Sequence, residues 1–200
     1  MDDWIEISNL RRLNKLMSNT HNLTLPISKD QLQQIKVGDR VYITGTICTG
    51  RDHFHKRVIK MDQNHQKYPD SFDLLKGGAL YHMGPIVKKN ANDSYTLVSG
   101  GPTTSARMNP FQTDVCKILE CPIVIGKGGM DNINWGEIPA IYLHYPGGAG
   151  AIVSKFVQKV LFVEWLDLGS PEAAWFLDMK NFGPLVVTID ALGGNLYEKS

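Results

Sequence analysis

The spacing of apolar residues predicts strands and short helices that follow one another along most of the chain. Two-residue alternation, typical of half-buried strands, appears first over residues 23–27 and 41–47. Between these strands, Ser28 is placed to cap a short helix that runs to Ile35. Further strands are predicted, in chain order, over residues 79–83, 95–99, 123–125, 140–143, 161–165 and 185–190.

Helical spacing follows several of these strands. One helix is expected after the polar segment 51–57, and a second contains the apolar residues of 108–119 at helical intervals, with Thr103 or Thr104 as its N-cap. A third helix is expected over residues 149–160. Strands outnumber helices but alternate with them, which is typical of an α/β domain with a layered mixed sheet.

The N-terminal residues have a different pattern of apolar and polar positions. Apolar residues recur there at nearly helical spacing and then give way to the polar run Ser18-Asn19-Thr20-His21-Asn22. We therefore expect an N-terminal helical extension and linker over residues 1–22, followed by one domain over residues 23–200.

Length and charge narrow the classes of function. A chain of 200 residues with 42% hydrophobic residues can form one compact domain with a proper core. Its formal net charge of +1 gives no general attraction to nucleic acid or to an acidic membrane surface, so any anion binding must be local. There is neither an apolar run long enough to cross a bilayer nor a leader-like N-terminus, so we expect a cytoplasmic protein.

The three cysteines do not look like metal ligands. Cys48, Cys116 and Cys121 lie in mostly apolar segments, which suits buried, reduced thiols. Their separations match neither the paired CxxC of zinc sites nor the close spacing of common iron–sulfur ligands. We expect this chain to hold no metal.

Polar and cationic residues gather directly after predicted strands, where sites are often built. They are Arg51, Asp52, His55, His82, Thr103, Thr104, Arg107 and Lys127. Taken singly, each has an ordinary explanation as a solvated charge, a helix cap or a structural histidine.

Two more specific interpretations of these residues can be excluded because the sequence lacks residues that they require. A metal pair formed by His53 and His55 lacks a third ligand nearby. A phosphate loop around Lys127 would need glycine in place of Cys121 and serine or threonine in place of Gly128. What remains is a set of cations, glycines and a helix N-terminus, which suits a small carboxylate ligand.

Six segments of the chain carry a resemblance to a known family. They are GTICTGRDHFHKR (45–57), HMGPIVKK (82–89), GPTTSARM (101–108), GKGGM (126–130), WLDLGSPEAAW (165–175) and FGPLVVTIDALGGNL (182–196). Together they resemble the C-terminal, or β, part of class I iron–sulfur fumarate hydratases and L(+)-tartrate dehydratases, and the resemblance extends over residues 23–200.

This resemblance implies a swivelling β/β/α domain that acts as the β subunit of a hydro-lyase. The partner α subunit would hold a [4Fe–4S] cluster with one iron open to substrate, and this chain would bind no cluster. The two kinds of subunit would assemble as an α₂β₂ tetramer. The reaction would be reversible hydration and dehydration of a small dicarboxylate. Fumarate and L-malate stand slightly ahead of L(+)-tartrate, whose dehydration gives oxaloacetate.

The resemblance also suggests roles for individual residues. Thr103 would transfer the carbon-bound proton, with help from an acidic group of the α subunit, because a threonine hydroxyl alone is a poor base. Arg51, Arg107 and Lys127 would bind the substrate carboxylates and stabilise the charge that develops on them. The open iron would assist departure of hydroxide as a Lewis acid. Supporting roles are expected for Asp52, His55 and Thr104.

Other interpretations stay open at this point. The chain could be a non-catalytic carboxylate-binding domain, although the joint presence of Thr103, Arg107 and Lys127 argues against this. Aconitase-like isomerases would have serine- and arginine-containing motifs of their own in place of GPTTS and GKGGM. In the absence of the α subunit, the chain could also pair with itself.

Overall fold

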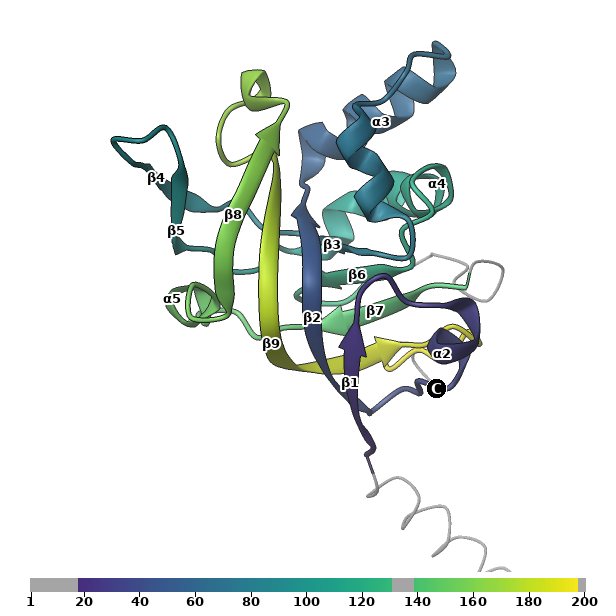
Figure 1. Cartoon of the computed structure of the whole chain (residues 1–200). Helices are drawn as coiled ribbons and strands as arrows, with labels where there is room; N and C mark the ends of the chain where they lie inside the picture. Colours follow the sequence, from purple (N-terminus) through teal and green to yellow (C-terminus); the bar gives the residue numbers. More distant parts are fainter. Residues whose placement is uncertain (1–17, 131–138, 198–200) are drawn as a thin grey trace, which may run out of the picture.

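A seven-stranded mixed sheet forms the centre of the computed structural model, which describes residues 18–130 and 139–197 (Figure 1). The strand order is β1-β2-β3-β6-β7-β9-β8, and β4 and β5 form a separate hairpin. The strands are β1 (Thr20–Thr24), β2 (Arg40–Thr49), β3 (Ala79–Tyr81), β4 (Ile86–Lys89), β5 (Tyr95–Ser99), β6 (Ile123–Gly126), β7 (Ile141–His144), β8 (Val157–Glu164) and β9 (Ala174–Ile189). The predicted α/β class with a layered mixed sheet is confirmed.

Helices are short and lie between the strands. The α-helices are α2 (Lys29–Gln33), α3 (Asp52–Gln63), α4 (Asn109–Ile118) and α5 (Gly150–Val153), and 3₁₀ turns cover Asp70–Leu75, Ser105–Met108 and Leu166–Leu168. In the described ranges, none of the helices has the length and apolar character needed to cross a bilayer.

Strand pairing brings distant parts of the chain together. β1, β2, β3, β6 and β7 run parallel to one another, whereas the long strand β9 runs antiparallel to β7, β8 and β2. Because β9 pairs with both β7 and β2, the strands β2, β3, β6, β7 and β9 form a closed ring of pairings. Every residue of β3 and β6 is buried, as expected for parallel strands that are covered on both faces.

Three clusters of buried apolar side chains form the core. The first includes Tyr81, Trp175 and Phe182. The second packs α3 and α4 against the sheet, with Phe54 and Val115 among its members. The third contains residues of α4, β6, β7 and β9. In Figure 1, α3 and α4 lie beside each other, next to β3 and β6.

A glycine sets the position at which α3 leaves the sheet. The helix begins three residues after the end of β2, and Gly50 lies in the turn. A Cβ atom there would lie 2.6 Å from a ring carbon of Phe54 and 2.9 Å from Leu80. The absent side chain therefore lets Phe54 pack closely and places the residues that follow Gly50 at the edge of the sheet.

Several local predictions are confirmed. Ser28 caps α2 in a capping box with Gln31, whose amide lies 3.3 Å from Ser28 Oγ. The strands expected over 41–47, 95–99 and 123–125 are present within β2, β5 and β6.

Other predictions are wrong. Residues 20–22, expected in a linker, form the start of β1, where His21 Nε2 lies 2.8 Å from Asp39 Oδ2. The helix expected over 149–160 ends at Val153, and β8 follows because its residues pair with β9. The helical extension predicted before residue 18 lies outside the described residues.

Candidate active site

The candidate site lies where four parallel strands end. β2, β3, β6 and β7 are consecutive parallel neighbours, so their carboxyl ends meet at one edge of the sheet. Arg51 follows β2, His82 follows β3, and Lys127 follows β6. Ligands of α/β sheets commonly bind beyond the carboxyl ends of such strands. The fold therefore brings together residues that are far apart in the sequence.

The segment 103–105 extends this edge of the sheet. The amide of Thr103 donates a hydrogen bond to the carbonyl of His82 at 2.7 Å, and the amide of Ser105 donates to the carbonyl of Lys127 at 3.0 Å. A side chain at Gly126 would overlap Ser105 Oγ, so this glycine is what allows the segment to lie between the ends of β3 and β6.

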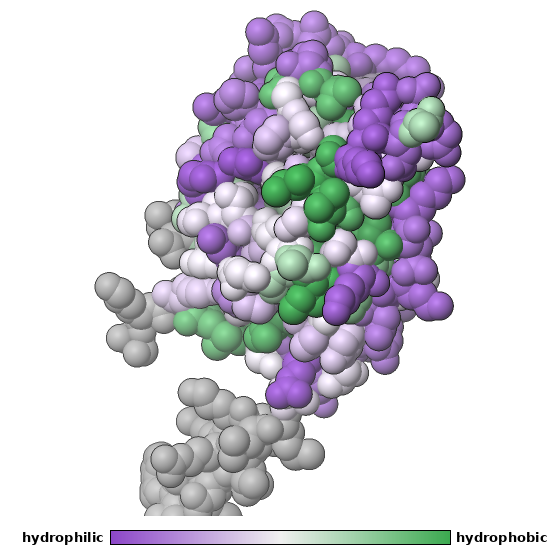
Figure 2. Space-filling view, turned by 90° about the vertical axis from the view of Figure 1, so that its left-hand side faces the viewer, coloured by the Kyte–Doolittle hydropathy of each residue, from purple (hydrophilic) through white to green (hydrophobic). Residues whose placement is uncertain are grey.

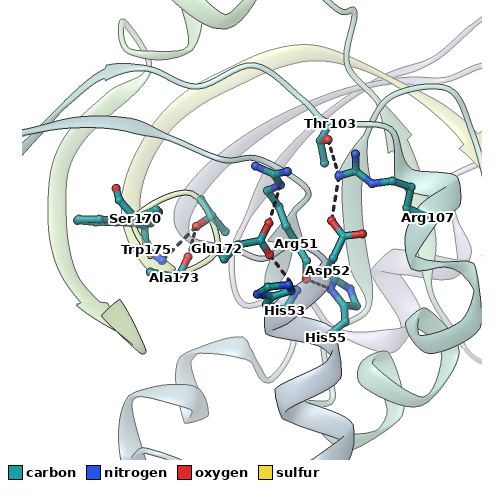
Figure 3. Close-up of polar contacts among 11 residues, drawn as sticks. Arg51, Asp52, His53, His55, Thr103, Arg107, Ser170, Glu172, Ala173 and Trp175 are labelled. Atoms are coloured by element: carbon teal, nitrogen blue, oxygen red, sulfur yellow. Dashed lines mark hydrogen bonds and ion pairs between the residues drawn. The ribbon is translucent and has the colours of Figure 1, made fainter. Parts of the chain in front are cut away.

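Thr103, Arg107 and Asp52 form a short polar chain (Figure 3). Arg107 Nη2 donates to Thr103 Oγ1 at 2.9 Å and lies 2.9 Å from Asp52 Oδ2. Arg107 is 44% exposed and Asp52 is 28% exposed, so the ion pair contributes little to folding. Its effect is to hold one guanidinium nitrogen against the threonine hydroxyl.

Arg51 directly precedes α3 and has a carboxylate neighbour of its own, Glu172 (Figure 3). Arg51 Nε is 3.4 Å from Glu172 Oε1, and the other carboxylate oxygen accepts a hydrogen bond from the amide of His53 at 2.9 Å. The guanidinium packs over Gly84, where a Cβ would displace it. Asp52, for which a supporting role is predicted, pairs with Arg107.

Glu172 was not identified from the sequence. It belongs to the segment WLDLGSPEAAW, but its contact with His53 spans 119 residues of chain. No local pattern of charge or spacing signals such a contact. The carboxylate also lies at the N-terminus of α3, where the helix dipole favours a negative charge.

Glu172→Ala is expected to lower the free energy of unfolding by about 1–2 kcal/mol, because the amide of His53 loses its acceptor and Arg51 loses its counter-charge. Urea denaturation of the full chain measures this. Glu120→Ala removes an exposed carboxylate elsewhere and should change stability by less than about 0.5 kcal/mol. Equal losses in the two variants would contradict the capping role.

The predicted supporting residues lie in different environments. His55 is completely buried, and its Nδ1 lies 2.7 Å from the carbonyl oxygen of Arg51, so it contacts the backbone of that residue. Burial lowers the pKa of His55, and it lowers that of His82 still further, with His55 adding to the effect on His82. Thr104 is exposed and stands at the N-cap position of the 3₁₀ turn Ser105–Met108, but its side chain makes no cap bond, and the N-cap of α4 itself is Met108.

Lys127 completes the set of cations at this edge. Its backbone pairs with Thr104 in an isolated parallel bridge, and its side chain lies over Gly147, in the loop after β7. The structure therefore links Thr103 to Lys127 through backbone hydrogen bonds of the segment 103–105 and to Arg107 through its hydroxyl, with Arg51 at the end of β2 on the same edge of the sheet.

The cysteines do not form a ligand set. All three are buried and unpaired, and burial raises the pKa of Cys116 to about 12 and those of Cys48 and Cys121 well above the ordinary value. Metal ligation requires thiolates, which these surroundings disfavour. Across residues 18–130 and 139–197, no group of three or more histidine, cysteine or acidic side chains is arranged to hold a metal ion.

Comparison with known proteins agrees with the motifs at this edge. The family model described as "Fumarase C-terminus" matches residues 2–200. The chain belongs to the fumarase C-terminus family. This confirms the resemblance stated from the sequence.

Three named relatives match most of this chain. It is 42% identical to the putative L(+)-tartrate dehydratase subunit beta of Methanocaldococcus jannaschii, over 86% of this chain and 89% of that protein. It is 41% identical to the L(+)-tartrate dehydratase subunit beta of Escherichia coli K12, over 89% of this chain and 87% of that protein. A putative class I fumarate hydratase of Geobacillus stearothermophilus is 37% identical over 88% of this chain, which covers 33% of that protein.

Proposed function

We propose that this chain is the β subunit of a hydro-lyase that adds water to, and removes water from, a small dicarboxylate. The observation that carries the proposal is the hydroxyl of Thr103, held by Arg107 at a sheet edge that also presents Arg51 and Lys127. The names of the relatives, tartrate dehydratase β subunits and a fumarate hydratase, support this class of reaction.

The cations have a clear task in such a reaction. Removing a proton next to a carboxylate places negative charge on the carboxylate oxygens, and fixed cations lower the barrier by stabilising that charge. Arginine can bind a carboxylate through two parallel hydrogen bonds, and lysine contributes a point charge. Arg51, Arg107 and Lys127 together can hold the two carboxylates of one substrate.

Thr103 is the proposed proton-transfer residue. Its oxygen accepts a hydrogen bond from Arg107, so its own O–H is free to donate to another group. The adjacent guanidinium stabilises the negative charge that develops on Oγ1 when the hydroxyl loses its proton. An acidic residue of the α subunit would draw off that proton, because Asp52 contacts Arg107 and not the hydroxyl.

The [4Fe–4S] cluster belongs to the α subunit in this proposal. The three buried cysteines of this chain, with raised pKa values, do not fit as ligands for it. The Geobacillus relative also supports a partner, because this chain matches only a third of that longer protein. We propose that the remainder corresponds to a separate α chain here, in an α₂β₂ cytoplasmic enzyme whose β subunit forms the swivelling domain.

An apolar surface is available for a partner chain. Figure 2 shows the face that lies at the left of Figure 1, where apolar side chains gather among polar ones. The elements on that side expose Ile86, Val98 and Ile152, which are 63%, 53% and 49% accessible. Contiguous exposed apolar side chains often mark protein interfaces, and we assign this surface to the α subunit. In its absence the isolated chain could pair with itself.

Coexpression with an α-type protein tests the function. The complex, reconstituted anaerobically with iron and sulfide, is assayed for fumarate formation from L-malate and for oxaloacetate formation from L(+)-tartrate. Both substrates are tested, because both kinds of enzyme occur among the relatives. We expect turnover with the two chains together and none with either alone, and the faster reaction identifies the substrate.

Failure of a folded, cluster-loaded complex to turn over either diacid would contradict the proposed reaction. Binding of malate or tartrate by such a complex without turnover would favour the carboxylate-binding domain. Equal turnover by the α chain alone would show that this chain contributes no catalytic group.

A further inference from the structure

A fully buried polar network lies behind the candidate site. Its centre is the side-chain amide of Gln112 on α4, which is inaccessible to solvent. The Oε1 position of this amide lies 2.9 Å from His55 Nε2 and 2.7 Å from His82 Nε2, and the Nε2 position lies 3.3 Å from Cys116 Sγ. His82 Nδ1 is in turn 2.8 Å from Ser105 Oγ.

The contact of His55 with a backbone carbonyl defines which of its ring nitrogens carries the proton. His55 Nδ1 is 2.7 Å from the carbonyl oxygen of Arg51, and a carbonyl can only accept, so Nδ1 carries a hydrogen. A neutral imidazole has a single N–H, so Nε2 must accept. The group of Gln112 that faces it must then be the NH₂, which requires the amide to be turned by 180° about its last bond.

The remaining hydrogen bonds agree with this orientation. The second N–H of the amide donates to His82 Nε2, so the proton of His82 lies on Nδ1 and is donated to Ser105 Oγ. The amide oxygen then faces the thiol of Cys116, which burial keeps protonated and able to donate. Among the two imidazoles, the amide and the thiol, each donor meets an acceptor and no charge is buried. Ser105 Oγ also lies 2.9 Å from the hydroxyl oxygen of Tyr142. The opposite orientation would place the amide oxygen, an acceptor, against the unprotonated Nε2 of a neutral His55, which is also an acceptor, or would demand a buried imidazolium.

The network reaches three residues of the site. His55 binds the carbonyl of Arg51, the carbonyl of His82 receives the amide of Thr103 at 2.7 Å, and Ser105 donates its amide to the carbonyl of Lys127 at 3.0 Å. These links join α3, the end of β3, the segment 103–105 and the end of β6. Buried and fully paired networks of this kind rigidify what they connect.

We propose that Gln112 is a positioning residue whose NH₂ group, donated to two neutral histidines, holds the backbones of Arg51, Thr103 and Lys127 in register. The amide does not contact the substrate, and it acts through His55 and His82. The inference deepens the proposed function and rests on it for its catalytic consequence. The protonation pattern is independent of any reaction.

The first test is spectroscopic and uses the full wild-type chain. Long-range ¹H–¹⁵N spectra of histidine-labelled protein near pH 7 should show His55 and His82 as neutral Nδ1–H tautomers with unprotonated Nε2. A proton on Nε2 of either ring would overturn the inference, whatever the chain catalyses. This measurement needs no substrate and no partner, so it separates this inference from the proposed reaction.

The second test is kinetic and uses the complex with the α subunit. Gln112→Met keeps the length of the side chain but removes the amide, and it should lower kcat by about 10–100-fold with a smaller change in KM, since misplaced groups bind the transition state less well. Gln63→Met, at the exposed end of α3, is the matched control and should change kcat by less than about twofold. Equal kcat values for Gln112→Met and Gln63→Met would overturn the positioning role. If Gln112→Met does not fold, the spectra of the wild-type chain still test whether the NH₂ group of Gln112 donates to the two histidines.

Discussion

Thr103→Val is expected to lower kcat of the assembled enzyme by about 10²–10⁴-fold, the range usual for loss of a general acid or base. Valine has nearly the shape of threonine but lacks the hydroxyl, so the segment 103–105 keeps its backbone bonds to His82 and Lys127. Arg107 loses one hydrogen-bond acceptor and keeps Asp52. The loss should therefore appear in kcat, with a small change in KM. Steady-state rates with L-malate and L(+)-tartrate measure both constants.

Two further variants make this result specific. Thr103→Ser keeps the hydroxyl and should retain most of the activity, whereas Thr24→Val, on an exposed position of β1, should leave the rates within about twofold of the wild type. Wild-type kcat in Thr103→Val, with a folded complex, would rule out a proton-transfer role for this hydroxyl.

The α/β class, and most of the strands near the site, could be predicted because the signals are local. The alternation over 41–47 and the capping residue Ser28 report on backbone geometry within a few residues. Residues 149–160 show the limit of such reasoning. Their apolar positions fit a helical face, but Val157 and Val160 pair with β9, and this long-range pairing overrides the local preference.

The residues of the site also divide into those that local sequence signals identify and those that depend on long-range packing. Arg51 and Lys127 could be grouped from the sequence because each stands after a predicted strand, and β2, β3 and β6 are parallel neighbours whose ends meet. Thr103 follows β5 of the separate hairpin, and it reaches the same edge through the hydrogen bonds of the segment 103–105. Glu172 and Gln112 could not be grouped from the sequence, because their contacts depend on how β9 and α4 pack against residues far away in the chain. The Gln112 contacts with His55 and His82 span 57 and 30 residues. The chemical roles of the grouped residues stay predictions.

Arg107→Met should lower kcat/KM by about 10²–10³-fold, comparable to loss of one donor that stabilises a developing anion. The loss has two sources. The guanidinium no longer binds the substrate carboxylate or supports Thr103 Oγ1, and Asp52, which is 28% exposed, is left as an unpaired anion near a dianionic substrate. Arg40→Met, which removes an exposed arginine at the start of β2, is the matched control and should stay within about twofold.

The contribution of Asp52 can be separated from that of Arg107. If repulsion by the unpaired carboxylate matters, the double variant Asp52→Asn/Arg107→Met should have a lower KM than Arg107→Met, with kcat still low. Arg107→Lys should fall between the wild type and Arg107→Met, because an ammonium restores the charge but not the planar group that reaches Thr103 and Asp52 together. Wild-type kcat/KM in Arg107→Met would exclude this residue from carboxylate binding and would leave Arg51 and Lys127 as the cations of the site.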